Sequence, residues 1–193
     1  MAQSSDAEKK AKARRDALER IRSLVELYNR VVDERGYKGY DTKLMRDLRV
    51  VDADPTTGVV TWELDVDGYW ANMNGVMHGG AHATIFDMCT SFGISMISKP
   101  GYWEFLAGVS RILNISYLKA VPIGVTVRIK TQVEGHGKSM ALASATMESP
   151  DGKIKYSTVQ QHKFHTPARP EFAELVREWW AKWGEDGGRQ VKL

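Results

Sequence analysis

The stretch HGGAHATIFDMCTSFGISMIS, residues 78–98, decides the fold of this chain. Its apolar side chains run almost all the way round a helix and leave little polar face. The segment Lys99-Pro100-Gly101 directly after it stops the helix, because proline cannot continue the hydrogen-bond pattern. A helix that is apolar on every side must be enclosed, so we expect this helix to lie at the centre of the fold.

The same stretch carries chemically capable groups at two places. Asp87 lies in the middle of the apolar run, where an unpaired carboxylate is costly, so it needs a polar partner or a function. Gly79 and Gly80 open the helix, where the first amide groups lack acceptors and the positive end of the macrodipole points outward. Such a helix start can hold a developing oxyanion.

Segments with the alternation of half-buried strands flank this helix. Before it, a short strand is predicted at 48–51 and a second strand at 60–66. After it, four strand-like segments follow, at 109–118, 124–134, 139–148 and 153–165. This order predicts an α+β fold in which an antiparallel sheet wraps around one long central helix.

A further helix is predicted at each end of the chain. Apolar residues recur at helical spacing from Leu18 to Val32, and Gly36 ends that pattern. At the other end, Pro170 stands at a first helical position, and residues 170–183 place three tryptophans on one side of a helix. We expect this Trp-rich stripe to pack against the sheet or against a neighbouring subunit.

Composition indicates one domain with extra segments. The chain has 193 residues, 42% of them hydrophobic, and a formal net charge of only +3, which does not indicate nucleic-acid binding. No stretch approaches the ~20 apolar residues of a membrane span, and the N-terminus lacks an apolar signal core. The single Cys89 excludes an intramolecular disulfide framework and fits a reducing compartment. We expect an intracellular protein, in the cytoplasm rather than in mitochondria, because acidic residues interrupt the basic N-terminus.

The residues around the central helix resemble a known family. The matching stretches are Asn72-Met73-Asn74-Gly75-Val76-Met77-His78-Gly79-Gly80, continuing through Ala83-Thr84 to Asp87, and then Gly108-Val109-Ser110 and Asn114-Ile115-Ser116-Tyr117-Leu118. They are similar to the hotdog-fold acyl-CoA thioesterases of the phenylacetyl-CoA thioesterase type, including the small vertebrate acyl-CoA thioesterases. The HGG-to-Asp spacing between strands is fairly specific, whereas HGG alone is weak. The resemblance implies an N-terminal helical extension (1–45), a hotdog thioesterase domain (46–166) and a C-terminal amphipathic helix with a tail (167–193).

The resemblance also implies roles for single residues. Asp87 matches the acid that activates water or attacks the thioester, and Ser110 matches the hydroxyl that helps to hold the water. Asn72 matches a side chain beside the thioester, Gly79 the backbone donor to its carbonyl, and His78 the histidine that positions the site. The implied reaction is hydrolysis of an acyl-CoA to a carboxylic acid and free CoA, without a metal or an organic cofactor. Whether Asp87 is a general base or a nucleophile that forms an anhydride stays open.

The spacing of these groups indicates a site shared between subunits. Nine residues separate His78 from Asp87, which is about 13 Å of helical rise and roughly half a turn of phase. The two side chains of one chain therefore cannot flank one carbonyl, and a second copy must supply one of them. We predict that Asp87 and Ser110 of one protomer face the helix start of its two-fold mate, which carries His78, Gly79 and Asn72. The result is a homodimer with two equivalent sites, and its pairing into a homotetramer stays open.

Two predictions concern the ends of the substrate. The CoA phosphates need cations at the rim of the site, and Lys138 beside Gly137, in a turn similar to the Gly-Lys-Thr turn of the family, is a candidate. Tyr102, Trp103 and Phe105 follow the central helix and either line an acyl tunnel or serve only as packing. The acyl group itself cannot be identified from the sequence.

Other interpretations of the same residues stay open. Asp87 can be a structural carboxylate in the dimer seam, and the alternative function is a non-catalytic hotdog protein that binds acyl-CoA or serves as an assembly module. His78 and His82 have the spacing of zinc ligands, but Gly79 replaces the glutamate of HExxH and no further ligand is placed convincingly. A hotdog hydratase or dehydratase would need an acid and histidine pair that we do not find. The complete set of polar site residues favours a thioesterase.

Overall fold

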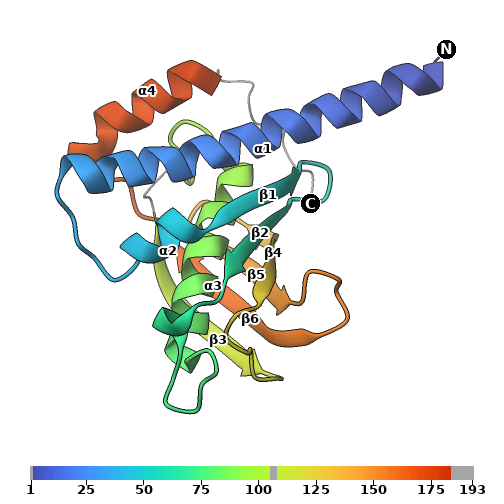
Figure 1. Ribbon diagram of the computed structural model, residues 1–193. Helices are drawn as coiled ribbons and strands as arrows, with labels where there is room; N and C mark the ends of the chain where they lie inside the picture. Colours follow the sequence, from blue (N-terminus) through green and yellow to red (C-terminus); the bar gives the residue numbers. More distant parts are fainter. Residues whose placement is uncertain (1, 105–107, 184–193) are drawn as a thin grey trace.

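An antiparallel sheet that curls around one helix forms the body of the protein (Figure 1). The computed structural model describes residues 2–104 and 108–183. The sheet has six strands in the order β1-β2-β4-β5-β6-β3, so β1 and β3 are its edges. The strands are β1 (Arg49–Asp54), β2 (Val59–Asp65), β3 (Val109–Tyr117), β4 (Thr126–His136), β5 (Met140–Glu148) and β6 (Lys155–Phe164). This arrangement is the predicted α+β fold.

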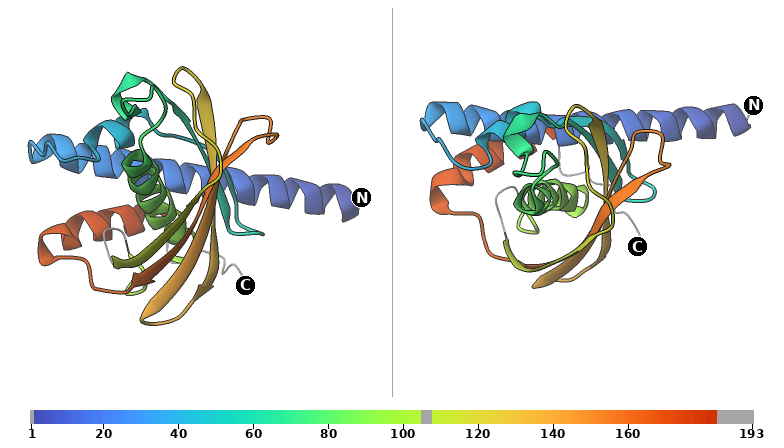
Figure 2. Two further views of the ribbon diagram at one scale, coloured as in Figure 1. Left: turned by 90° about the horizontal axis from the view of Figure 1, so that it is seen from below. Right: turned by 60° about the horizontal axis from the view of Figure 1, so that its bottom comes forward.

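Helix α3 (Gly79–Gly93) runs along the concave side of the sheet, as Figure 2 shows. Ile85, Phe86 and Cys89 are fully buried, which is the enclosure that a helix apolar on every side requires. Gly93 allows a close approach to β4, because an added Cβ would lie 2.7 Å from Thr131 Oγ1. The predicted extent of this helix was too long: it ends at Gly93, and the last turn tightens into the 3-10 helix η2 (Ile94–Ile97).

The N-terminal helix α1 (Ala2–Glu34) lies against β1 and reaches the far end of α3 (Figure 1). Ile21 and Leu24 are almost completely buried there, and the Tyr28 ring meets Phe92 of α3 edge-on, with 5.8 Å between the ring centroids. A short helix after it, α2 (Thr42–Asp47), was not predicted. Six residues are too few to form a helix by intrinsic propensity, so tertiary contacts must stabilise it.

The C-terminal helix α4 (Ala173–Trp183) follows the 3-10 helix η3 (Pro170–Phe172) and lies beside α1 (Figure 1). Trp179 Nε1 donates to Ser23 Oγ of α1 at 2.9 Å. The Arg20 guanidinium of α1 lies over the rings of Trp179 and Trp180, at 5.2 and 5.1 Å from their centroids. We expected the sheet or a neighbouring subunit as the partner of this stripe, and in the structure α1 is its partner. Within the described ranges, no helix is long and apolar enough to cross a membrane.

Candidate active site

Asp87 is held by side chains from two strands. Ser110 Oγ of the edge strand β3 donates to Asp87 Oδ1 at 2.5 Å, and Gln161 Nε2 of β6 donates to the same oxygen. Gln161 Nε2 also donates to Ser110 Oγ at 2.9 Å, which closes a triangle of hydrogen bonds. Both contacts to the carboxylate end on Oδ1. Among the described residues Oδ2 has no hydrogen-bond partner, so Oδ2 is the oxygen that can act on a substrate.

A β-bulge turns Ser110 toward Asp87. In β3, Leu113 lies opposite Gln161 of β6, and alternation from Leu113 would place Arg111 on the inner face. The pairing shifts between Ser110 and Ile112, so Ser110 lies opposite Lys163 instead. The bulge therefore exchanges an arginine for a serine on the side of the strand that faces α3.

Thr90 orients the Gln161 amide. Thr90 lies on α3, and its Oγ1 is 2.5 Å from Gln161 Oε1, so the amide oxygen faces the threonine and the amide NH2 faces Asp87. Gln161 is fully buried and Asp87 is partly exposed. A buried, oriented amide beside a partly exposed carboxylate keeps that carboxylate in one position.

A cavity of about 460 Å³ opens beside Asp87. Its lining from α3 is Asp87, Met88, Ser91 and Phe92, and Ser110 and Lys163 line it from the sheet. Helix α1 also contributes to the wall, with Leu24 and Tyr28. The volume lies within the range of small-molecule pockets, so the carboxylate faces a space that an acyl group can enter.

Lys163 is an unexpected part of this wall. It is 6% exposed, and its Nζ donates to Ser91 Oγ at 2.6 Å. Burial lowers the pKa of Lys163, while the negative charge of Asp87 raises it. Gln161 and Lys163 therefore form two successive polar contacts between β6 and α3, with Asp87 and Ser91 one helical turn apart.

The helix start presents one bare amide. His78 is the N-cap, and its Nδ1 accepts from the Gly80 N–H at 2.9 Å. The His78 carbonyl accepts from the Ala81 N–H at 2.9 Å. In the part of the chain that the structure describes, the Gly79 N–H has no acceptor. The Tyr117 hydroxyl of β3 donates a hydrogen bond to the Gly79 carbonyl at 3.0 Å, which shows that this helix start lies beside the edge strand.

Asn72 lies in the turn before the helix. Its Oδ1 accepts from the Asn74 N–H at 2.8 Å, and its carbonyl accepts from the Gly75 N–H at 3.0 Å. Gly75 has a φ of 72°, the left-handed conformation that this turn needs. The side-chain NH2 of Asn72 has no acceptor among the described residues, so it is available to a ligand.

The structure thus divides the predicted site residues into two groups. Asp87 and Ser110 are in contact near the middle of α3. His78, Gly79 and Asn72 gather at the start of the same helix. In the predicted dimer, each active site combines the first group from one protomer with the second group from the other.

The residues predicted at the CoA rim lie in the turn between β4 and β5. The Gly137 carbonyl accepts from the Tyr102 hydroxyl and from Trp103 Nε1, both at 3.1 Å. Trp103 has a φ of 48°, is 2% exposed and lines the cavity, so this turn anchors part of the cavity wall. Lys138 is exposed, and Phe105 lies outside the described residues.

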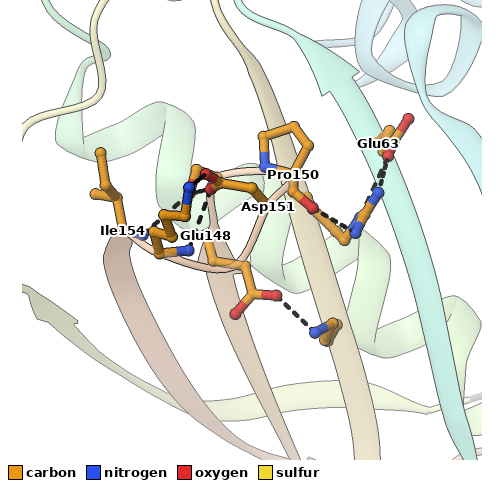
Figure 3. Close-up of polar contacts among 9 residues, drawn as sticks. Glu63, Glu148, Pro150, Asp151 and Ile154 are labelled. Carbon is orange, nitrogen blue, oxygen red and sulfur yellow. Dashed lines mark hydrogen bonds and ion pairs between the residues drawn. The ribbon is translucent and has the colours of Figure 1, made fainter.

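Two other cations, near the opposite end of β4 from this turn, are already paired. Arg128 of β4 donates to Glu63 and to the Pro150 carbonyl, with N–O distances of 2.7 and 2.6 Å, and Figure 3 labels these two partners. Lys130 Nζ lies 2.6 Å from Glu148 Oε1. These contacts lie on the convex face of the sheet, away from α3, so both side chains contribute to the surface of the sheet and not to the cavity.

The two histidines with zinc-like spacing have different environments. His78 is exposed and caps the helix. His82 is buried, its Nδ1 lies 2.9 Å from Ser157 Oγ, and burial lowers its pKa to about 4. Within residues 2–104 and 108–183, no group of three or more His, Cys, Asp or Glu side chains could hold a metal ion.

Sequence reasoning missed four polar residues of the site and the contribution of α1. The missed residues are Thr90, Ser91, Gln161 and Lys163. The signal for two of them was present in the alternation of β6, where polar Gln161 and Lys163 occupy inward-facing positions that follow buried Val159. A buried polar residue at an apolar position of a strand needs a partner, and here the partners are on α3.

Part of the chain is similar to a known family. The family model described as "Thioesterase superfamily" matches residues 74–156, a range that includes Asp87, Ser110 and the helix start. This part of the chain, less than half of its length, is similar to the thioesterase superfamily. Acyl-coenzyme A thioesterase 13 of Mus musculus is 28% identical to the chain over 109 residues, which cover 56% of this chain and 72% of the mouse protein.

Solved structures of thioesterases have a similar fold. Zebrafish thioesterase superfamily member 2 matches with a TM-score of 0.63 and 25% identity, and the match covers 76% of this chain and 98% of that chain. A hypothetical thioesterase from Streptococcus pneumoniae, solved with coenzyme A, matches with a TM-score of 0.54 and 22% identity over 64% of this chain and 89% of that one. The fold is the hotdog fold, and the predicted resemblance to hotdog thioesterases is confirmed.

Proposed function

We propose that this protein hydrolyses acyl-CoA thioesters to a carboxylic acid and free CoA. The observation that carries the proposal is Asp87, a partly exposed carboxylate beside a cavity, with Oδ1 held by Ser110 and Gln161 and Oδ2 without a hydrogen-bond partner among the described residues. The thioesterase domain of the chain and the name of its mouse relative, an acyl-coenzyme A thioesterase, support the same chemistry.

The geometry supports a simple sequence of steps. Asp87 Oδ2 takes a proton from a water molecule, and the resulting hydroxide attacks the thioester carbonyl carbon. The negative charge that develops on the carbonyl oxygen accepts a hydrogen bond from a Gly79 N–H. The C–S bond then breaks, the CoA sulfur takes the proton from Asp87, and the carboxylic acid leaves. Direct attack by Oδ2, through an anhydride that water then hydrolyses, has the same balance. Neither route requires a metal or an organic cofactor.

The proposed site includes a second copy of the chain. Asp87 and Gly79 of one chain are eight residues apart on α3, which is about 12 Å of rise, so they cannot act on one carbonyl. The strand β3 is an unpaired edge and exposes apolar side chains, with Val109 at 47%, Ile112 at 48% and Tyr117 at 57% exposure. An exposed apolar edge strand is a template for pairing with another chain. A dimer that joins two β3 edges would bring each Ser110 and Asp87 toward the partner copy.

The cellular compartment and higher assembly remain predictions. The single cysteine of the chain, Cys89, supports a reducing intracellular compartment, and its thiol is fully buried. Exposed Lys138, in the turn after Gly137, is the proposed contact for the CoA phosphates. Pairing of dimers into a tetramer would need a further surface.

Gly79→Pro offers a direct test of the oxyanion donor. Proline removes the N–H and adds a ring that fixes φ, and Gly79 is the first helical position, where proline is favoured. His78 before it has φ −66° and ψ 141°, the extended conformation that a residue before proline adopts. We expect Gly79→Pro to lower kcat for thiol release about 10²- to 10³-fold. The matched control is Gly79→Ala, which retains the N–H and places its Cβ 3.4 Å from the Tyr117 hydroxyl, an ordinary contact.

Mixed dimers test whether the site is shared. A heterodimer of one Asp87→Asn chain and one Gly79→Pro chain contains one intact site if each site combines the two protomers. We expect this heterodimer to regain about half of the wild-type turnover, while both mutant homodimers stay inactive. A heterodimer as inactive as the homodimers would show that the site lies within one chain. Binding of acyl-CoA without hydrolysis by the wild-type protein would favour the non-catalytic alternative.

A further inference from the structure

The N-terminal helix forms part of the cavity beside Asp87. Leu24 and Tyr28 of α1 line it, although α1 lies well outside the matched thioesterase region, residues 74–156. The Tyr28 ring meets the Phe92 ring of α3 edge-on at 5.8 Å. Helix α1, which lies outside the matched thioesterase region, therefore forms part of the wall of the cavity that the acyl group would occupy.

Tyr28 is fixed at that wall from two sides. Its hydroxyl donates to Asp41 Oδ2, and Asp41 also lines the cavity. Burial, together with the neighbouring Asp41 charge, raises the pKa of Tyr28, so the phenol stays a neutral donor. Ring packing on one side and a charge-assisted hydrogen bond on the other hold the aromatic ring in one place.

The distance from Asp87 to this wall sets a length. Phe92, on which Tyr28 packs, is five residues after Asp87 on α3, which corresponds to about 7.5 Å of rise and about 140° of turn, and both residues line the cavity. The cavity lining also includes apolar Met88 and Trp103, together with polar Ser91, Ser95 and Glu104. An acyl chain whose carbonyl carbon lies at Asp87 and which runs along α3 would meet the tyrosine ring after about six to eight carbons.

We propose that Tyr28 of α1 closes the acyl pocket and restricts the enzyme to short and medium acyl chains, up to about eight carbons. This inference rests on the proposed thioesterase function and adds its substrate class. The N-terminal helix is then a specificity-determining part of the enzyme. Tyr28 acts by the volume of its ring, and its hydroxyl serves to hold that ring in place.

The test is a chain-length profile of thiol release by the full-length protein. Saturated acyl-CoAs from butyryl to dodecanoyl are compared for the wild type, Tyr28→Leu, Tyr28→Ala and Tyr28→Phe. We expect wild-type kcat/KM to fall beyond octanoyl, and the dodecanoyl-to-butyryl ratio to rise about tenfold or more in Tyr28→Ala, with Tyr28→Leu between them. Tyr28→Phe retains the ring and should retain the wild-type profile.

Tyr37→Ala is the matched control. The Tyr37 hydroxyl also donates to Asp41, at 3.2 Å, but Tyr37 is 48% exposed and does not line the cavity. Its chain-length profile should equal that of the wild type. An unchanged profile in both Tyr28→Ala and Tyr28→Leu, or an equal change in Tyr28→Phe, would overturn the inference.

The outcomes separate this inference from the proposed function. Hydrolysis with a profile that Tyr28 does not influence refutes the inference alone. If no acyl-CoA is hydrolysed, the proposed function is wrong, and the same length series is measured as binding by calorimetry. Equal affinity profiles for the wild type and Tyr28→Ala would then overturn the inference as well.

Discussion

Replacing Asp87 by asparagine should remove the chemistry and leave the fold almost unchanged. Both hydrogen bonds to the Asp87 side chain end on Oδ1, from Ser110 and from Gln161. An asparagine that keeps its oxygen in that place accepts both bonds, and its new NH2 takes the position of the free Oδ2. A charge-assisted bond is stronger than a neutral one by about 1 kcal/mol, so the two bonds lose about 2 kcal/mol together. Relief of carboxylate desolvation offsets part of that loss, so we expect a net destabilisation of about 1 kcal/mol.

The effect on the reaction should be far larger. The amide of Asp87→Asn cannot take a proton from water at neutral pH, and a positioned general base contributes about 10²- to 10⁴-fold to a rate. The activation free energy should therefore rise by about 3 to 5 kcal/mol. The assay is thiol release from an acyl-CoA that the wild type hydrolyses, measured beside urea unfolding of both proteins.

Glu134→Gln is the matched control for this variant. Glu134 of β4 also accepts a hydrogen bond from a serine, Ser144, but on the exposed face of the sheet. Its hydrolysis rate should equal the wild-type rate. If Asp87→Asn hydrolyses the substrate at the wild-type rate, Asp87 takes no part in the reaction. If it unfolds at a much lower urea concentration, the argument that both bonds survive is wrong.

Three further predictions test the packing, the pH dependence and the assembly. Gly93→Ala should destabilise the fold by about 1 to 3 kcal/mol in urea unfolding, because the new Cβ would lie 2.7 Å from Thr131 Oγ1; an unchanged midpoint would mean that α3 can move away from β4 without cost. Burial lowers the pKa of His82 from 6.5 to about 4, so the unfolded chain binds more protons between these values. The free energy of unfolding should therefore decrease as the pH falls through that window, by about 3 kcal/mol at most, and His82→Gln should flatten this slope; equal slopes would assign the pH dependence to other groups. Ile112→Lys, which adds a charge to the exposed edge strand β3, should shift the protein toward monomer in sedimentation and reduce thiol release, and a fully active monomer would contradict the shared site.

Much of the fold could be predicted from the periodicity of apolar residues. The errors of that prediction have physical causes. Each of the predicted strands appears within a few residues of its expected bounds, because alternation records which face of a strand is buried. The central helix was predicted too long, because an apolar sequence does not distinguish an α-helical turn from the 3-10 turn of Ile94–Ile97. The short helix Thr42–Asp47 was missed, because its stability comes from tertiary contacts, among them the bond from Asn29 Nδ2 to the Met45 carbonyl.

The amino-acid sequence determined that one apolar helix would be enclosed by an antiparallel sheet. It also determined that a carboxylate, Asp87, would lie on that helix, beyond a start that contains Gly79 and Gly80. Those features depend on local periodicity and on neighbours within a few turns. The tertiary structure alone decided which side chains meet that carboxylate. A bulge turned Ser110 inward in place of Arg111, and Gln161 arrived from a strand 74 residues later in the chain. The tertiary structure also placed Tyr28 of the N-terminal helix in the cavity wall. Such contacts depend on register and on the packing of distant segments, which a pattern of polar and apolar residues does not specify.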